Sequence, residues 1–270
     1  MGAVADRSPP GEVTDDAFLG GALAILQPRR GYRAGLDAVM LAAAVAASGT
    51  RAPRVLDLGA GVGTAGLCVA RRVPHAEVVL LERAPQLAAL AAENIARNGL
   101  GDRVRVVNAE IGAPALALRA AGVDDESFTH VIANPPYHDS DAGTTAPDAG
   151  KAASHAMPDT EIERWARFAA RMSMPRGEVV MIHKAEALPR LLGALEPRFG
   201  TLRVLPLHPR AGDPAHRVIV SGTKASRAPL QLLAGFVLHG EGHAFTQAAQ
   251  RILKDGAALD IEPSSPSAPG

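Results

Sequence analysis

The sequence predicts an α/β protein built on a doubly wound sheet of seven strands. Two observations indicate this class. Short apolar runs alternate with helix-forming segments from residue 54 onward, and continuous apolar runs bounded by glycine are typical of parallel strands buried on both faces. The last two runs, 202–207 and 217–223, have no helix between them. We therefore expect them to pair as an antiparallel hairpin at one edge, which makes the last strand antiparallel.

Seven strands and five helices follow one another in the predicted domain, residues 51–224. The expected strands are residues 54–59, 77–82, 103–108, 128–134, 177–183, 202–207 and 217–223. The expected helices are residues 63–73, 84–99, 114–122, 160–173 and 187–197. Parallel neighbours need a crossover of a dozen or more residues, usually a helix, so this alternation predicts helices on both faces of the sheet.

A small cap is predicted on the N-terminal side, at residues 14–50. It consists of a short hairpin around Gly20 and Gly21, followed by a helix that ends at Gly49, a residue type common at helix C-termini. Residues 1–13 are rich in proline, serine and glycine, so we expect them to be disordered.

A second addition is predicted at residues 225–261, on the C-terminal side. It contains one expected strand, 231–239, and one expected short helix, 246–256, and we interpret it as an appendage on the same domain. The tail, 262–270, has the composition of a disordered segment.

Composition excludes several broad classes. The 28 basic and 28 acidic residues give a net charge of +0, so binding to nucleic acid would need a local basic patch. The chain has a single cysteine, Cys68, which cannot form an internal disulfide and favours a reducing, cytoplasmic location. No apolar run approaches the roughly 20 residues of a membrane span, and the N-terminal residues contain no apolar h-region, so we expect no secretory signal there.

Residues 56–66, LDLGAGVGTAG, place several glycines directly after the first predicted strand. Glycine lets the backbone turn tightly and lets a ligand approach it, and the next helix points its N-terminal amides at that ligand. With Glu82 about 20 residues further on, the segment also satisfies the dinucleotide fingerprint, so a dinucleotide-dependent oxidoreductase is an alternative. Asp57 argues against it, because a carboxylate at the strand end repels a pyrophosphate. A ligand with an ammonium group, a sulfonium and a ribose suits the segment better.

A second motif, NPPY at residues 134–137, follows the fourth predicted strand. Proline fixes φ and removes a backbone donor, so the chain leaves the sheet through a stiff turn. The side-chain carbonyl of Asn134 and the main-chain carbonyl of Pro135 can each accept one N–H of a planar amine. Pro136 keeps the turn rigid, and Tyr137 can stack on the planar substrate. Held in this way, the nitrogen lone pair leaves conjugation and can face an electrophile bound at the glycine-rich segment, so positioning carries most of the catalysis.

The two motifs together resemble those of the class I S-adenosylmethionine-dependent methyltransferases, which have a Rossmann-like fold. The resemblance implies S-adenosylmethionine as the cofactor. It places around the methionine and ribose parts Asp57, Gly59, Gly61 and Gly63. Glu82 is implied as the acceptor for the ribose hydroxyls, and Asn108 or Glu110 as the contact to adenine.

Residues 17–224 are similar to a bacterial family of tRNA methyltransferases that modify N6 of an adenine beside the anticodon of a valine tRNA. The similarity includes the segment GYRAGLDAVMLAA, residues 31–43. By this resemblance, Arg33, Gly35 and Asp37 cap the donor pocket from the N-terminal side. Methyltransferases with NPPY also modify glutamine side chains in proteins, or amino groups of ribosomal RNA and DNA. These acceptors, and a non-catalytic protein that binds the donor, remain alternatives.

Basic residues near the hairpin and in a long loop are the candidate tRNA contacts. They are Arg29, Arg30, Arg33 and Lys151. The loop 138–158 is polar and glycine-rich, and we expect it to order over a substrate, with His155 as a further phosphate contact.

Three other residue types have simpler interpretations. His239 and His243 lie in a turn that lacks a third ligand, so we expect no metal site. Cys68 is predicted to be a core thiol, and Trp165 to pack on an amphipathic helix.

Overall fold

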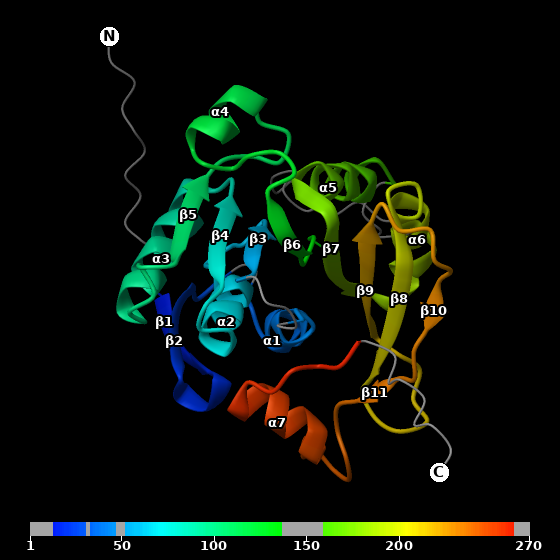
Figure 1. Ribbon diagram of the computed structural model, residues 1–270. Coiled ribbons are helices and arrows are strands. Elements are labelled where there is room, and N and C mark those ends of the chain that lie inside the picture. Colours follow the sequence, from blue (N-terminus) through cyan, green and yellow to red (C-terminus); the bar gives the residue numbers. More distant parts are fainter. Residues whose placement is uncertain (1–12, 31–32, 47–51, 137–158, 262–270) are drawn as a thin grey trace, which may run out of the picture.

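A mixed sheet of nine strands runs through the centre of the protein, with helices on both faces (Figure 1). The computed structural model describes residues 13–30, 33–46, 52–136 and 159–261. Seven strands form the main body of the sheet, in the order β8-β9-β7-β6-β3-β4-β5. β9 runs antiparallel to both β7 and β8, whereas the pairs from β7 to β5 are parallel. The predicted fold class is therefore confirmed.

The strands match the predicted apolar runs closely. They are β3 (Arg54–Leu58), β4 (Glu77–Glu82), β5 (Val104–Asn108), β6 (Phe128–Ala133), β7 (Ser173–Lys184), β8 (Phe199–His208) and β9 (Arg217–Lys224). The helices that connect them are α2 (Thr64–Arg72), α3 (Pro85–Arg97), α4 (Ala115–Ala120), α5 (Asp159–Met172) and, after the short turn η2 (Ala185–Ala187), α6 (Leu188–Leu195).

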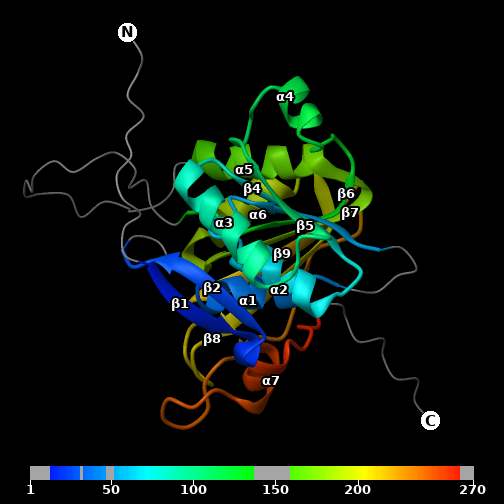
Figure 2. The same ribbon diagram turned by 90° about the vertical axis from the view of Figure 1, so that its left-hand side faces the viewer.

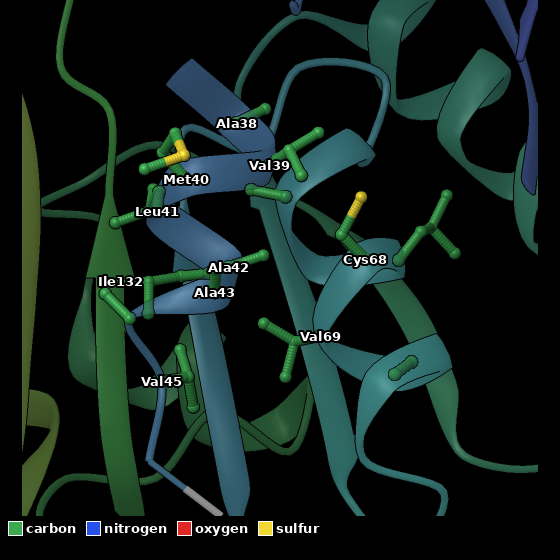
Figure 3. Close-up of a cluster of buried hydrophobic side chains, with 14 of the residues drawn as sticks. Ala38, Val39, Met40, Leu41, Ala42, Ala43, Val45, Cys68, Val69 and Ile132 are labelled. Atoms are coloured by element: carbon green, nitrogen blue, oxygen red, sulfur yellow. The ribbon is translucent and has the colours of Figure 1, made fainter. Parts of the chain in front are cut away.

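Two apolar cores lie on opposite faces of the sheet. One core packs α1 (Leu36–Ala43), α2 and α3 against the sheet, and the other packs α4, α5 and α6. Figure 3 shows part of the first core, where Met40 and Leu41 of α1 face Ile132 of β6, and Val69 and Cys68 belong to the neighbouring helix α2. All five side chains are fully buried, and burying a large aliphatic side chain stabilises a fold by about 1.5–3 kcal/mol. The thiol of Cys68 thus belongs to the core, as predicted.

The N-terminal hairpin and the C-terminal appendage meet on the α1 side of the sheet (Figures 1 and 2). The hairpin comprises β1 (Val13–Phe18), the turn η1 (Leu19–Gly21) and β2 (Leu23–Pro28). Helix α7 (Gln247–Asp255) packs against η1 and α1. Arg72 of α2 connects α1 to the end of α7, because its guanidinium donates to the carbonyls of Ala42 (2.5 Å) and Gly256 (2.9 Å).

The structure corrects three details of the sequence prediction. The helix expected to end at Gly49 ends at Ala43, because the chain turns at Ala44 and buries Val45; Gly49 itself lies outside the described residues. The strand expected at 231–239 is split into β10 (Gln231–Leu232) and β11 (Phe236–Val237), each parallel to β8. The split falls where the backbone of Gly235 lies against His208: a Cβ there would be 2.3 Å from the imidazole Nε2.

The third correction concerns the position of the last two strands. β8 and β9 do pair as an antiparallel hairpin, as expected. However, β9 lies between β7 and β8, and β10 and β11 extend the sheet beyond β8, so the hairpin does not form the edge. Among the described helices, none combines the length and apolar character that crossing a membrane requires.

Candidate active site

Predicted site residues lie together at the carboxyl ends of neighbouring parallel strands. Backbone pairing sets Leu58 of β3 beside both Leu81 of β4 and Ala133 of β6. The residues that directly follow these three in sequence are Gly59, Glu82 and Asn134. Asn108, at the end of β5, pairs with Glu82. In open α/β sheets ligands bind outside this edge, so the structure brings the glycine loop and the start of the NPP turn to one place.

The glycine loop after β3 requires its glycines for two different reasons. Gly59, Gly61 and Gly63 all adopt positive φ, at 63°, 57° and 88°, which side chains rarely tolerate. At Gly59 an added Cβ would lie 2.5 Å from Cη2 of Trp165, and at Gly63 it would lie 2.7 Å from Cδ1 of Leu80. At Gly61 it would meet no atom within 4 Å. The first and third glycines therefore permit packing, whereas Gly61 faces open space that a ligand can enter.

Asp57 is a buried carboxylate under this loop. Its side chain is 2 % exposed and accepts a hydrogen bond from the backbone N–H of Gly66, at 2.9 Å. Burial raises the pKa of Asp57 from 3.8 to about 7; the Gly66 hydrogen bond opposes the rise, and the charge of Glu82 adds to it. A buried carboxyl near its titration point becomes a stable anion when a cation binds beside it.

Glu82 holds the loop through both of its carboxylate oxygens. Oε2 accepts from the N–H of Gly61 and Oε1 from the N–H of Ala84, each at 2.8 Å. Each carboxylate oxygen has two lone-pair sites, so these bonds leave acceptor capacity for hydroxyl donors. Glu82 thus combines a structural role in the loop with the geometry expected of a ribose contact.

The two residues proposed as adenine contacts both bind within the protein. The Asn108 side chain donates to the carbonyls of Glu82 (2.8 Å) and Arg83 (3.0 Å), which fastens the end of β5 to the end of β4. Glu110 forms an ion pair with Arg164 of α5 at 2.7 Å, and the hydrogen bond from Arg164 lowers the pKa of Glu110. Arg164 also donates to the carbonyl of Ile111, so this ion pair connects the loop after β5 to α5.

The NPP turn begins where β6 ends. Asn134 is half-buried, Pro135 is buried and Pro136 is exposed. Tyr137 lies outside the described residues, as do Lys151 and His155. The described part of the turn therefore places Asn134 and Pro135 beside the glycine loop.

Residues Arg33, Gly35 and Asp37 lie where the hairpin leads into α1. Arg33 forms an ion pair with Asp16 at 2.6 Å and donates to the Thr14 hydroxyl at 2.7 Å, so it fastens the open end of the hairpin. Asp37, in the first turn of α1, accepts from Nε of Arg217 at 2.9 Å.

Arg217 connects this segment to the site. It begins β9, beside Lys184 at the carboxyl end of β7. The ion pair between Asp37 and Arg217 thus anchors the start of α1 at the same edge of the sheet as Asn134. Gly35 precedes that helix, and a Cβ there would meet no atom within 4 Å.

Sequence reasoning missed several residues that shape the site. Trp165 does pack, as predicted, but the structure shows that it packs against Gly59. Asn94 of α3 and Arg217 were not singled out, because their partners are distant in sequence. The asparagine spacing in "ENIARNG" was the available signal for Asn94.

His239 of the HGEGH turn has its side-chain partners close by in the sequence. His239 stacks on Phe245, with ring centroids 4.6 Å apart, and its Nδ1 lies 3.2 Å from the carbonyl oxygen of His243. Among the described residues, no group of three or more His, Cys, Asp or Glu side chains could hold a metal ion.

Several known proteins are similar to this chain in sequence and in fold. A family model of the methyltransferase small domain matches residues 36–155. A crystal structure of a predicted O-methyltransferase from Agrobacterium tumefaciens is 34% identical, with a TM-score of 0.69, and the match covers 83% of this chain and 98% of that one.

Two curated relatives match shorter segments. A tRNA1(Val) (adenine(37)-N6)-methyltransferase from Porphyromonas gingivalis is 28% identical over 158 residues, which is 58% of this chain and 60% of the relative. A release factor glutamine methyltransferase from Geobacter sulfurreducens is 36% identical over 90 residues, 32% of this chain and 28% of the relative. The matches thus span about 60% of the length of the first relative and less of the second.

The sheet order, the glycine loop and these similarities define a methyl-transferring class of protein. The chain belongs to the S-adenosylmethionine-dependent methyltransferases, whose cofactor is S-adenosylmethionine. The described residues fit this cofactor: Gly61 leaves open space, Asp57 offers a carboxylate that suits an ammonium group, and Glu82 offers acceptor sites for hydroxyls.

Proposed function

We propose that this protein transfers a methyl group to the exocyclic N6 amine of an adenine in tRNA. One observation carries the proposal: Asn134 and Pro135 directly follow β6, whose last residue, Ala133, pairs with Leu58, the residue before Gly59. An acceptor held by their carbonyls would lie next to the donor loop. The similarity to a tRNA adenine-N6 methyltransferase supports this choice of acceptor.

The proposed chemistry depends on how the acceptor is held. The cofactor supplies an electrophilic methyl group on a positively charged sulfur. The carbonyls of Asn134 and Pro135 accept the two N–H groups of the amine, which keeps its lone pair out of conjugation with the ring. Pro136 restricts the turn, so this geometry exists before the substrate binds. Preorganised contacts of this kind reduce the barrier because little ordering remains to be done in the transition state.

The same geometry favours an amine over a hydroxyl acceptor. The similar Agrobacterium structure is described as a predicted O-methyltransferase. A hydroxyl has one hydrogen to donate, and must lose it as the new bond forms. An NH₂ group has two, which matches the two carbonyls of the turn, and its nitrogen becomes acidic after methylation. We therefore propose nitrogen as the acceptor atom.

Contacts to RNA are proposed at the hairpin. Arg29 and Arg30 are exposed and directly follow β2, and Arg33 forms an ion pair with Asp16. Arginines that bind phosphates release counterions, so RNA affinity should fall as salt rises. Lys151, in the part of the chain outside the described residues, is proposed as a further contact.

Methylation of a glutamine side chain in a protein is the second candidate function. The similarity to a release factor glutamine methyltransferase favours it, and a primary amide also offers two N–H groups on a conjugated nitrogen. The two candidates share the turn and differ only in the acceptor.

The deciding experiment uses labelled S-adenosylmethionine and separate pools of tRNA, ribosomal RNA, DNA and protein. Label in tRNA, recovered as N6-methyladenosine after nuclease digestion, is the expected result. Label in protein alone would reject the tRNA proposal and support the glutamine alternative.

Replacing Asn134 tests the role of the turn. Asn134→Ala should lower kcat by about 100-fold or more, the scale of loss when one preorganised polar contact is removed. Donor affinity should remain within about twofold, because Asn134 is proposed to contact the acceptor and not the donor. Isothermal titration with the donor measures the second quantity. Loss of donor binding in this variant would show that Asn134 belongs to the donor site.

A further inference from the structure

A fully buried asparagine connects the donor loop to the N-terminal hairpin. Asn94 lies in α3 and is 0 % exposed. Its Oδ1 accepts from the N–H of Leu26 at 2.8 Å, and its Nδ2 donates to the carbonyls of Leu26 and Val62, each at 3.0 Å. Leu26 belongs to β2, and Val62 lies between Gly61 and Gly63 in the donor loop.

The position of Asn94 follows from matching repeats in a helix and a strand. Asn98, four residues later, makes the same pair of contacts to Ala24: its Oδ1 accepts from the N–H at 3.0 Å, and its Nδ2 donates to the carbonyl at 2.9 Å. Four residues of a helix rise about 6 Å and two residues of a strand about 6.6 Å. Two asparagines at this spacing can therefore bind alternate residues of β2 and complete the edge of the hairpin.

The two asparagines differ at the donor loop. Asn98 makes its further side-chain bond to the carbonyl of Asn94 within α3, at 2.8 Å. Asn94 instead reaches across to Val62. Because the Leu26 N–H requires an acceptor, Oδ1 of Asn94 faces that N–H. The amide group is then oriented so that both Nδ2 hydrogens point at carbonyls.

Asn94 completes the restraint of the donor loop. The Val62 carbonyl is held by Asn94, and the N–H of the same peptide group, on Gly63, donates to the Ala60 carbonyl at 2.8 Å. The peptide group between Ala60 and Gly61 is also held at both ends, since the Gly61 N–H donates to Glu82. Two peptide groups that flank the open side of Gly61 thus have defined orientations.

We propose that Asn94 is a positioning residue for S-adenosylmethionine. By holding the Val62 carbonyl against the hairpin, it keeps the loop in the shape that receives the donor. Preorganisation of this kind strengthens binding by reducing what must be ordered when the ligand arrives. The role lies outside the proposed acceptor chemistry and can be tested without any acceptor.

The test compares Asn94→Ala with Asn98→Ala as a matched control. Both variants remove an asparagine that fastens β2 to α3, but Asn94→Ala also releases Val62. We expect Asn94→Ala to weaken donor binding by about tenfold, a factor typical of one well-placed contact. Asn98→Ala should keep donor affinity within about twofold of wild type, even where its thermal stability falls. In turnover assays, KM for the donor should rise in Asn94→Ala while kcat at saturating donor stays near wild type.

Donor binding is measured by isothermal titration with S-adenosylmethionine and with S-adenosylhomocysteine, on protein shown to be folded by circular dichroism. If Asn94→Ala is poorly folded, all three proteins are measured in sucrose, which favours the folded state. Unchanged donor affinity in Asn94→Ala would overturn the proposal. An equal loss in both variants would also overturn it, because attachment of the hairpin, and not the Val62 contact, would then control the loop.

Discussion

The raised pKa of Asp57 leads to a specific expectation for how stability changes with pH. Burial raises this pKa from 3.8 to about 7. Each unit of pKa difference between the folded and unfolded states can change the free energy of unfolding by about 1.4 kcal/mol. The folded state therefore binds the proton more tightly than the unfolded state between these two values. The resulting stabilisation is present in full below about pH 4 and is lost as pH rises through 7. Between pH 5 and pH 8 the loss amounts to roughly 2–3 kcal/mol.

Asp57→Asn removes this dependence while keeping the shape of the side chain. The amide Oδ1 can still accept from the N–H of Gly66, and it carries no charge at any pH. Relative to wild type, the variant should therefore gain roughly 2–3 kcal/mol of unfolding free energy between pH 5 and pH 8. Burial also lowers the pKa of His130 and His183 to about 4, so they take up protons in the unfolded chain within this range; both proteins contain them, and their effect cancels in the difference.

Urea denaturation at pH 5 and pH 8, followed by circular dichroism, measures the four free energies of unfolding. A difference between variant and wild type that stays constant from pH 5 to pH 8 would refute the reasoning, because Asp57 would then titrate near its ordinary value. In the same variant, donor affinity at pH 7.5 should fall by about tenfold, since a neutral amide attracts an ammonium group less strongly than a carboxylate does.

Two further predictions concern the donor loop and a half-buried histidine. Gly59→Ala should destabilise the protein by more than about 2 kcal/mol, because positive φ alone costs roughly 1–2 kcal/mol and the new Cβ would lie 2.5 Å from Trp165. Gly61→Ala shares the positive φ but meets no atom within 4 Å; thermal denaturation should show a smaller loss, and titration should show weakened donor binding. Burial lowers the pKa of His130 to about 4, so its contribution to stability is present above about pH 6.5 and is lost as pH falls toward 4. His130→Gln should reduce the acid sensitivity of the protein in urea titrations at pH 5 and 7, and an unchanged pH dependence would contradict this.

Local patterns in the chain were sufficient to predict most of the architecture. Apolar runs and glycines marked the strands and the donor loop, and the missing helix between residues 207 and 217 predicted the antiparallel pairing of β8 and β9. These features depend on neighbours within a few residues, through side-chain periodicity and the backbone freedom of glycine and proline. The meeting of Gly59 and Asn134 at one edge could also be anticipated, because parallel strands end on the same side of a sheet.

Contacts between distant parts of the chain could not be anticipated in this way. Asn108 and Glu110 were predicted as adenine contacts from their place after β5, but the sequence did not indicate that their side chains also fasten β5 to β4 and to α5. The spacing of Asn94 and Asn98 was a local signal, but it did not reveal the partner of Asn94, because Leu26 is 68 residues away.

The donor loop could therefore be recognised from the amino-acid sequence, whereas the hydrogen bonds that hold its shape are decided by the tertiary structure. Turn chemistry is local and can be recognised in a short segment. The partner of a buried amide or carboxylate is selected by packing of the whole domain, where a polar group removed from water must find a hydrogen bond wherever the fold provides one.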